Sequence, residues 1–511
     1  MKTSRIKLFS LLFVVCFIVV ACGPKIGKAE LKESVLSYLS STDDLLYYGY
    51  IDYLHIKNQS ELQDIPGVGA FIQNKLTAIE SAIDVSKPIY FAISDVQNEV
   101  DIPNNSTFFF AVKDKDALAH VLEDLGLMRN EKSNLFLYGN NGLSIGFTDD
   151  IGVIAYDESG SNLEGEIIQT FATIEKGASK KEFEEVLSKK ADLIVASPII
   201  NVFQYLTHSD LPFATTKYSD FLEKIKITQG VTTVQFNDGE ISIQSELVFM
   251  NGDVQKHLDQ IFSKKNASII NYLGPNTPSS AFTCSVDVVA IENFIESHLM
   301  EKEQLKSGLQ MFYRSYGDKG ALIESIAKGK LTTIWDGVFG MSMNLSPELS
   351  KENGEESLTR YYVGLGTEKQ NIHDLIGSLA KGNKLQNYGD NFYGMGEESI
   401  LKVEENFLLI QDKIGGQKTF EVGKMDVNQL SEFGAQPISF YFKPTEDGKE
   451  FNYLGYPAFN VLTPIVDIVT LNMNSRKMEI KIQFKNKKEN SLKQLKDKLE
   501  RGIVNMSSYE F

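Results

Sequence analysis

Cysteine is scarce in this 511-residue chain, and its scarcity excludes several kinds of site. Two of the three cysteines, Cys16 and Cys22, lie close to the N-terminus, which leaves Cys284 without a partner. A disulfide framework and a zinc site built from several cysteines are therefore excluded. We expect Cys284 to pack as a small apolar side chain on a strand, since free cysteine is among the most buried residue types.

Positive charge is also in short supply. Lys and Arg together number 51 against 68 Asp and Glu, which gives a formal net charge of −17. Proteins that bind nucleic acid neutralise its phosphates with clustered Lys and Arg side chains. The acidic balance therefore argues against a nucleic-acid partner.

The N-terminal apolar run is too short to be a membrane-spanning helix, which needs about 20 apolar residues. The run Leu8–Val20 follows the basic residues Lys2, Arg5 and Lys7. A basic start, a short apolar run and a small residue before the cut form the layout of a secretory signal peptide. The ending Val-Val-Ala-Cys, which closes at Cys22, resembles the lipobox of bacterial lipoproteins, whose cysteine is lipidated and becomes the mature N-terminus.

This pattern predicts a signal peptide over residues 1–21 and lipidation of Cys22 by acyl chains such as palmitate, which would anchor the protein stably to a membrane. By resemblance to sorting in Gram-negative bacteria, Gly23 is not the aspartate that retains a lipoprotein at the inner membrane. We therefore expect a lipid anchor in the bacterial outer membrane. Whether the body faces the periplasm or the cell surface stays open.

Catalytic motifs are few, and the sharpest has a simpler interpretation. Residues 142–146 read Gly-Leu-Ser-Ile-Gly, which matches the nucleophile elbow of hydrolases around Ser144. An elbow requires a strand before the serine and a helix directly after it. Here a turn precedes Gly142, and Leu143–Phe147 is typical of a hairpin strand. We expect Ser144 to lie on that strand and outside any active site.

A second local motif resembles the helix-hairpin-helix of DNA-binding proteins. Ile65-Pro66-Gly67-Val68-Gly69 has its Gly-x-Gly turn, whose backbone amides hold a phosphate in that family. Gln73 stands where the motif requires a small residue, and the acidic body opposes DNA. We interpret the segment as a Pro-Gly turn that enters a helix over residues 70–82.

Histidine is rare too, and no His-Glu-x-x-His pattern is present. No two histidines are four residues apart, whereas zinc needs three or four converging ligands. The acid pairs Asp149-Asp150 and Glu404-Glu405 are typical of solvated turns. We therefore expect no catalytic residues, no cofactor and no metal site. The six histidines are His55, His120, His208, His257, His298 and His373.

The sequence does contain an internal correspondence. Residues 46–58 and 281–293 align without a gap, which places Asp52 opposite Asp287, and each segment is typical of a strand followed by a helix. Alternating apolar residues over 240–249 and 477–484 predict half-buried closing strands. The predicted equivalences also include Ile243 with Ile482, Val121 with Leu375, and Leu122 with Ile376.

The fold class that follows is α+β, with two tandem, internally duplicated repeats of antiparallel β-hairpins and amphipathic helices packed on one face. The alternative is that many unrelated α+β domains share a hairpin-then-helix order. The predicted division is residues 22–42 as a lipidated tether with a short helix, 43–265 as repeat 1, 266–276 as a linker, 277–504 as repeat 2, and 505–511 as a tail.

The lipobox, the strand-helix opening and the duplicated hairpin-plus-helix body together resemble the large lipoproteins of Bacteroidota-type bacteria that are assigned to a domain of unknown function. The resemblance implies location and architecture only. We predict a non-enzymatic binding or scaffold protein of the cell envelope, with the membrane as one partner and a protein, glycan or lipid as its ligand. The alternative is an envelope hydrolase with its site in the cleft between the repeats.

Overall fold

The computed structural model describes two compact units. Unit 1 comprises Met1–His208, Ile227–Phe249 and Lys487–Phe511, and unit 2 comprises Ser209–Lys226 and Met250–Asn486. Within them the structure describes residues 28–61, 77–95, 105–130, 135–138, 142–157, 163–174, 179–201, 216–265, 267–274, 277–315, 324–345, 357–382, 384–396, 399–412, 425, 433–444 and 462–498. No helix among these residues is long and apolar enough to cross a membrane.

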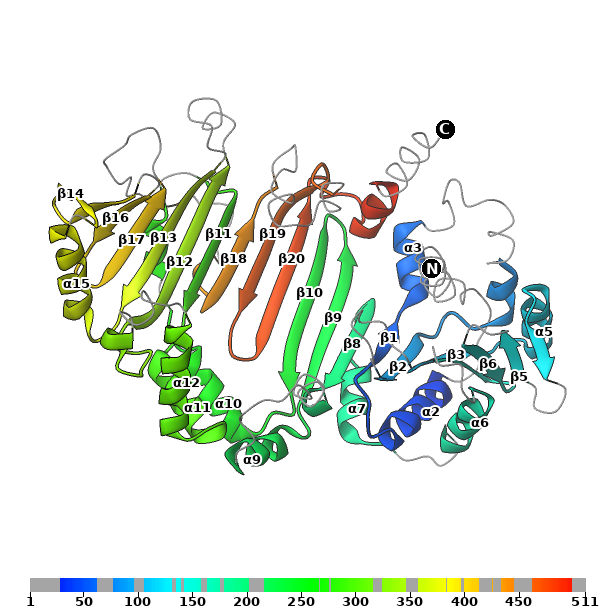
Figure 1. The fold of residues 1–511 in the computed structure, drawn as a ribbon. Coiled ribbons are helices and arrows are strands. Elements are labelled where there is room, and N and C mark those ends of the chain that lie inside the picture. Colours follow the sequence, from blue (N-terminus) through cyan, green and yellow to red (C-terminus); the bar gives the residue numbers. More distant parts are fainter. Residues whose placement is uncertain are drawn as a thin grey trace. The chain divides into compact units, whose positions relative to one another are not determined.

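Unit 1 is built on an antiparallel sheet (Figure 1). The pairings of its described strands give the spatial order β10-β9-β8-β1-β2-β3-β7-β6-β5-β4. The strands are β1 (Tyr47–Ile51), β2 (Ile89–Asp95), β3 (Asn105–Ala111), β4 (Met128–Asn130), β5 (Leu135–Tyr138), β6 (Leu143–Phe147), β7 (Ile151–Asp157), β8 (Leu193–Pro198), β9 (Gln229–Asn237) and β10 (Glu240–Val248).

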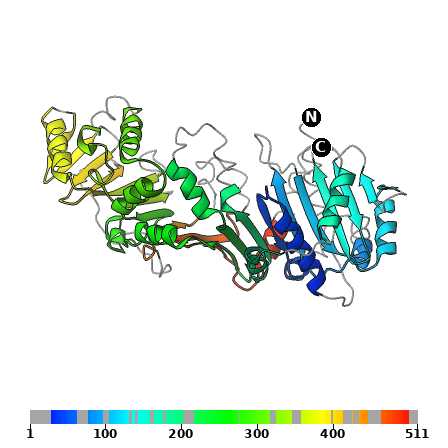
Figure 2. The same ribbon diagram turned by 90° about the horizontal axis from the view of Figure 1, so that it is seen from below.

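Helices cover both faces of this sheet, whereas the hairpin pattern predicted helices on one face. A strand directs successive side chains to opposite faces, and the neighbours Phe109 and Phe110 on β3 are both buried in separate cores. The first core packs against α2 (Lys28–Ser41), α6 (Leu163–Ile174) and α7 (Lys181–Leu187), and α2 contacts both of the other helices (Figure 2). The second core includes residues of α3 (Tyr53–Ser60) and α5 (Lys115–Asp124).

Unit 2 is built on a second antiparallel arrangement of strands. Their pairings give the order β20-β19-β18-β11-β12-β13-β17-β16-β15-β14. The strands are β11 (Ser280–Ser285), β12 (Trp335–Leu345), β13 (Ser357–Leu365), β14 (Gln386–Gly389), β15 (Phe392–Met395), β16 (Ser399–Val403), β17 (Phe407–Asp412), β18 (Ile438–Phe442), β19 (Val466–Met473) and β20 (Lys477–Phe484). The labelled helices are α9 (Thr216–Ile225), α10 (Gly252–Ile261), the 3-10 helix η2 (Ala267–Tyr272), α11 (Val288–His298), α12 (Lys302–Arg314) and α15 (Lys369–Lys381).

The described strands of the two units follow the same spatial order, since adding ten to each strand number of unit 1 reproduces the order of unit 2. The first strand of each unit leads directly into a helix capped by an aspartate. Asp52 accepts the backbone N–H of His55 at 3.1 Å, and Asp287 accepts that of Ala290 at 3.0 Å. The predicted correspondence of these two aspartates thus holds at the level of local structure.

A finer predicted equivalence, that of Ile243 with Ile482, is wrong by the hydrogen-bond register. Paired residues can be followed from strand to strand across each sheet, starting from Asp52 in unit 1 and Asp287 in unit 2. By this count Ser245 on β10 occupies the position that Met478 occupies on β20. Ile243 is then level with Arg476, which lies beyond the start of β20. The β9–β10 hairpin therefore extends further from its sheet than the β19–β20 hairpin, and hairpin length sets the register of paired residues.

The units differ from the predicted repeats in which segments they contain. Residues 209–226 and 250–265 belong to unit 2, and residues 487–504 belong to unit 1. The predicted linker 266–276 contains η2, where Ile269 is fully buried, and Leu273 after it is 1% exposed. These segments belong to the unit that buries their apolar side chains, because an apolar helix face has to pack against another surface.

Candidate functional site

Three helices of unit 2 bring polar side chains together. α11 contacts both α10 and α9. Asn251 caps the start of α10, since its side chain accepts the backbone N–H of Asp253 at 2.9 Å. Asp253 and His257 then lie one helical turn apart on the same face of α10. His298 is the last residue of α11. The packing of α11 against α10 places it beside the first turns of α10.

The three side chains converge at short range, and one ligand atom from each lies within 4.8 Å of the others. Nε2 of His298 lies 3.2 Å from Nδ1 of His257. The Asp253 carboxylate lies 3.7 Å from His257 Nδ1 through Oδ1, and 4.0 Å from His298 Nε2 through Oδ2. We call Asp253, His257 and His298 the histidine–aspartate cluster.

The cluster is buried on one side and open on the other. The side chain of His298 is 2% exposed, that of His257 22% and that of Asp253 52%. The imidazole of His298 packs against the rings of Phe294 and Phe221, with centroids 5.1 and 5.9 Å away. This apolar wall fixes the ring of His298 while solvent reaches the carboxylate.

Lys224 on α9 supplies a positive charge beside the cluster. Its ammonium lies 3.1 Å from Asp253 Oδ2 and 3.5 Å from His298 Nδ1. The hydrogen bond from Lys224 lowers the pKa of Asp253 below its usual range. Burial, assisted by the charge of Lys224, lowers the pKa of His298. Both effects favour the forms in which Asp253 and His298 offer lone pairs.

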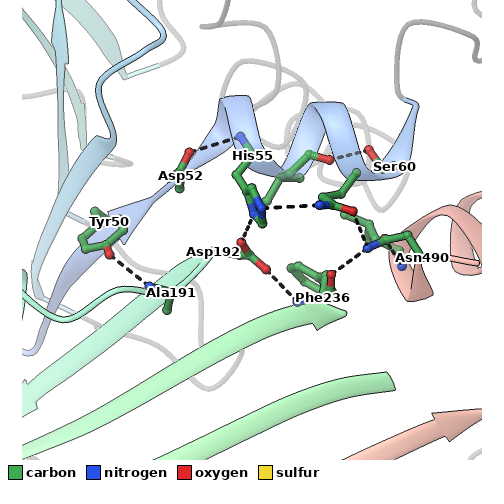
Figure 3. Close-up of polar contacts among 11 residues, drawn as sticks. Tyr50, Asp52, His55, Ser60, Ala191, Asp192, Phe236 and Asn490 are labelled. Atoms are coloured by element: carbon green, nitrogen blue, oxygen red, sulfur yellow. Dashed lines mark hydrogen bonds and ion pairs between the residues drawn. The ribbon is translucent and has the colours of Figure 1, made fainter. Parts of the chain in front are cut away.

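A second polar network lies in unit 1, at the start of α3 (Figure 3). Nδ1 of His55 bonds to Oδ1 of Asp192, a buried carboxylate whose Oδ2 accepts the backbone N–H of Phe236 at 2.6 Å. The other ring nitrogen of His55 lies 3.5 Å from the amide nitrogen of Gln59. Asn490 donates to the Gln59 side chain at 3.1 Å and to the Phe236 carbonyl at 2.6 Å.

This network has the aspartate–histidine part of a hydrolytic triad, in which a carboxylate orients an imidazole. A triad also requires a nucleophile against the second ring nitrogen, and that nitrogen of His55 faces the Gln59 amide. Asn490 also caps the helix of residues 491–498 by accepting the backbone N–H of Leu492 at 2.9 Å. The arrangement therefore fits an architectural role that holds this helix to α3 and β9.

The residues singled out by motif are dispersed in the structure. Ser144 lies on β6 and is fully buried, as expected for a strand residue and unlike an exposed nucleophile. Cys284 lies half-buried on β11, and burial raises the pKa of its thiol. Asp149 lies in the turn between β6 and β7 and pairs with Lys115 at 2.6 Å. Glu404 lies between β16 and β17, next to Lys402.

Other predicted features lie outside the described residues. These are the signal peptide with Cys22, the helix-hairpin-helix motif at 65–69, and His208. Among the described histidines, His55, His120 and His373 lie away from the histidine–aspartate cluster, on α3, α5 and α15.

The sequence did not predict the histidine–aspartate cluster, because no two of its histidines lie four residues apart. The available local signal was Asp-x-x-x-His at residues 253–257, whose spacing places both side chains on one helix face. Nothing local indicated His298, since it lies 41 residues from His257 along the chain. Only the packing of α11 against α10 brings it near.

No protein-family model matches the chain, and no curated protein matches it. Among solved structures, the chain is similar to one described as "Structure of crystal form I of TP0453". The sequence identity is 9% and the TM-score is 0.26, and the match covers 47% of this chain and 88% of that one.

Proposed function

We propose that this protein is a lipid-anchored, non-enzymatic binding or scaffold protein of the bacterial cell envelope. The observation that carries the proposal is the apolar run Leu8–Val20, which Ala21 and Cys22 follow directly. A run of this length suits export and cleavage, and it falls short of a membrane span. By resemblance to lipoprotein sorting, Gly23 favours the outer membrane as the site of the anchor.

The position of α2 supports a close association of unit 1 with the membrane surface. α2 begins at Lys28, and its residues Leu31, Val35 and Leu39 are buried in a core of unit 1. Five residues separate Cys22 from this helix. Even fully extended, a segment of this length reaches only about 20 Å. The lipid would therefore hold unit 1 beside the bilayer with little freedom.

We also propose that the two units arose by internal duplication. The matching strand orders and the paired aspartate caps support this origin. The paired helices α5 and α15 support it as well, since each follows the third strand of its unit. Leu122 on α5 is 5% exposed and Ile376 on α15 is 7% exposed, as equivalent core positions would be.

Replacement of the predicted lipidated cysteine tests the anchor. Cys22→Ala is expected to remove lipidation and to release the protein from the membrane fraction, because no acyl chain remains to be buried. Metabolic labelling with a fatty acid and fractionation of the envelope measure both effects. Cys284→Ala is the matched control, since its thiol lies on β11 in unit 2, and it should keep the label. Unchanged labelling and fractionation of Cys22→Ala would overturn the proposal.

A further inference from the structure

We propose that the histidine–aspartate cluster of unit 2 is a binding site for one divalent transition-metal ion of the Zn²⁺ class. Its ligands would be Nε2 of His298, Nδ1 of His257 and the Asp253 carboxylate. The site would join α10 to α11 and keep one coordination position open to solvent. It does not depend on the lipid anchor proposed for residues 1–22.

The two histidine nitrogens already have the spacing that such an ion requires, and the Asp253 side chain has to move to complete the site. Zinc binds imidazole nitrogen and carboxylate oxygen at about 2.0–2.2 Å, so tetrahedral ligand atoms lie about 3.3–3.6 Å apart. The two histidine nitrogens are already 3.2 Å apart. The carboxylate oxygens stand 3.7 and 4.0 Å from those nitrogens. One ligand atom from each of the three side chains lies within 4.8 Å of the others, so the half-exposed side chain of Asp253 has to bring one oxygen closer by up to about 1 Å.

Without a metal ion and with neutral imidazole rings, the groups of the cluster cannot all pair a donor with an acceptor. The ammonium of Lys224 only donates, so Nδ1 of His298 has to accept, and the proton of the neutral ring then lies on Nε2. That proton points at Nδ1 of His257, which must accept in turn. The same Nδ1 lies 2.9 Å from the Asp253 carbonyl oxygen, so two acceptors face each other.

In the other tautomer of His257 the proton lies on Nδ1. Two donors then face each other in place of two acceptors. Nδ1 then donates to the Asp253 carbonyl, but it also faces the N–H of His298. A cation between the two ring nitrogens satisfies both lone pairs at once. Nδ1 of the metal-bound His298 then carries the proton, so Lys224 has to move away. Its side chain is 37% exposed and has a flexible stem, which allows that movement.

The donor set indicates the chemical class of the ion. Two imidazoles and one carboxylate suit zinc and its neighbours in the first transition series, while Mg²⁺ and Ca²⁺ prefer oxygen ligands. Three protein ligands with a solvent-facing side leave a position for water or another ligand. His298 also ends α11, where the helix dipole favours a positive charge.

Titration of the purified full chain with Zn²⁺ alone tests the site. After treatment with a chelator, calorimetry should show one ion bound per chain, and Co²⁺ should give the visible absorption of a coordinated ion. Asp253→Asn and His257→Gln should each weaken Zn²⁺ binding at least about tenfold, since each removes a ligand. These two positions are used because His298 is buried, and its replacement tests folding as well.

Two further variants distinguish the site from general metal binding by histidines. His120→Gln is the matched control, because that side chain is 85% exposed on α5 in unit 1, and it should leave the affinity unchanged. Lys224→Met should strengthen binding about fivefold, since it removes a competing positive charge.

Three outcomes would overturn the proposal. They are the absence of saturable binding at one ion per chain, unchanged affinity in Asp253→Asn and His257→Gln, and an equal loss in His120→Gln. Weaker binding in Lys224→Met would overturn the placement of the ion between the two ring nitrogens. Because none of these measurements involves the membrane, failure here is distinguishable from failure of the lipid anchor.

Discussion

Residues 266–276 were predicted to be a linker, but their apolar side chains pack in unit 2. A substitution in this segment should therefore lower the stability of unit 2. Gly274 has a φ of +103°, a backbone conformation that residues with a side chain rarely adopt. A Cβ atom there would lie 2.5 Å from Nη1 of Arg360 and 2.8 Å from its Cζ. Arg360 is 1% exposed, so its guanidinium has little room to move.

Gly274→Ala therefore adds two costs. Forcing a positive φ on alanine costs about 1–2 kcal/mol. Displacing the guanidinium strains its hydrogen bond from Nε to Oε1 of Gln411, 3.0 Å long and fully buried, and a bond to a charged group contributes about 1.5–3 kcal/mol. We expect the free energy of unfolding of unit 2 to fall by about 2.5–5 kcal/mol.

Urea unfolding followed by tryptophan fluorescence measures this effect. Trp335, the only tryptophan of the chain, lies on β12 in unit 2 and donates to the Val338 carbonyl at 2.9 Å, so its emission reports this unit. Gly377→Ala is the matched control. That glycine lies in α15, and among the described residues nothing beyond the backbone of its own helix lies within 4 Å of an added Cβ, so alanine should leave stability unchanged or raise it by about 0.5–1 kcal/mol. A loss below about 1 kcal/mol in Gly274→Ala would refute the reasoning and restore the segment to a linker.

Three further predictions concern Ser144, the paired caps and Asp259. Ser144→Ala should raise the unfolding free energy by about 1 kcal/mol, because its buried hydroxyl has no hydrogen-bond partner among the described residues, and a fluorophosphonate probe should label neither form. Labelling of the wild type that is lost in the variant would instead favour a hydrolase. Asp52→Ala and Asp287→Ala should each cost about 1 kcal/mol in thermal unfolding, since each removes an N-cap; a large inequality would weigh against equivalent roles. Hydrogen bonds from Ser475 and then Arg476 lower the pKa of Asp259 in the folded state. Its contribution to stability is therefore fully present above the unfolded pKa of about 3.9 and is lost as pH falls through the lower folded pKa. Urea midpoints at acid pH should show a shallower fall in Asp259→Asn, and an unchanged slope would contradict this assignment.

Local patterns in the sequence predicted much of the secondary structure. The alternating residues over 240–249 and 477–484 form β10 and β20, because period-two alternation matches the two faces of a strand. The apolar residues Leu31, Val35, Leu36 and Leu39 form one buried side of α2. The alignment of Asp52 with Asp287 came from the sequence, and the structure adds that both aspartates cap the helix that follows.

Predictions that depended on length and register were less successful. Ile243 and Ile482 share a sequence pattern, yet the different extensions of their hairpins place them at different levels of their sheets. Residues 266–276 have the Gly-Pro composition of a linker, but Ile269 and Leu273 are buried in unit 2. Composition does not report whether a neighbouring surface is available to cover apolar side chains.

The sequence by itself determined the periodicity of the strands and helices, and it predicts a lipoprotein signal over residues 1–21. Each of these depends on residues within one or two turns of each other. Only the tertiary structure decided which helices meet, and therefore that His298 joins Asp253 and His257 while His55 joins Asp192. The physical reason is that such groups are brought together by the burial of apolar faces from distant segments, and local sequence carries no record of which faces will be paired.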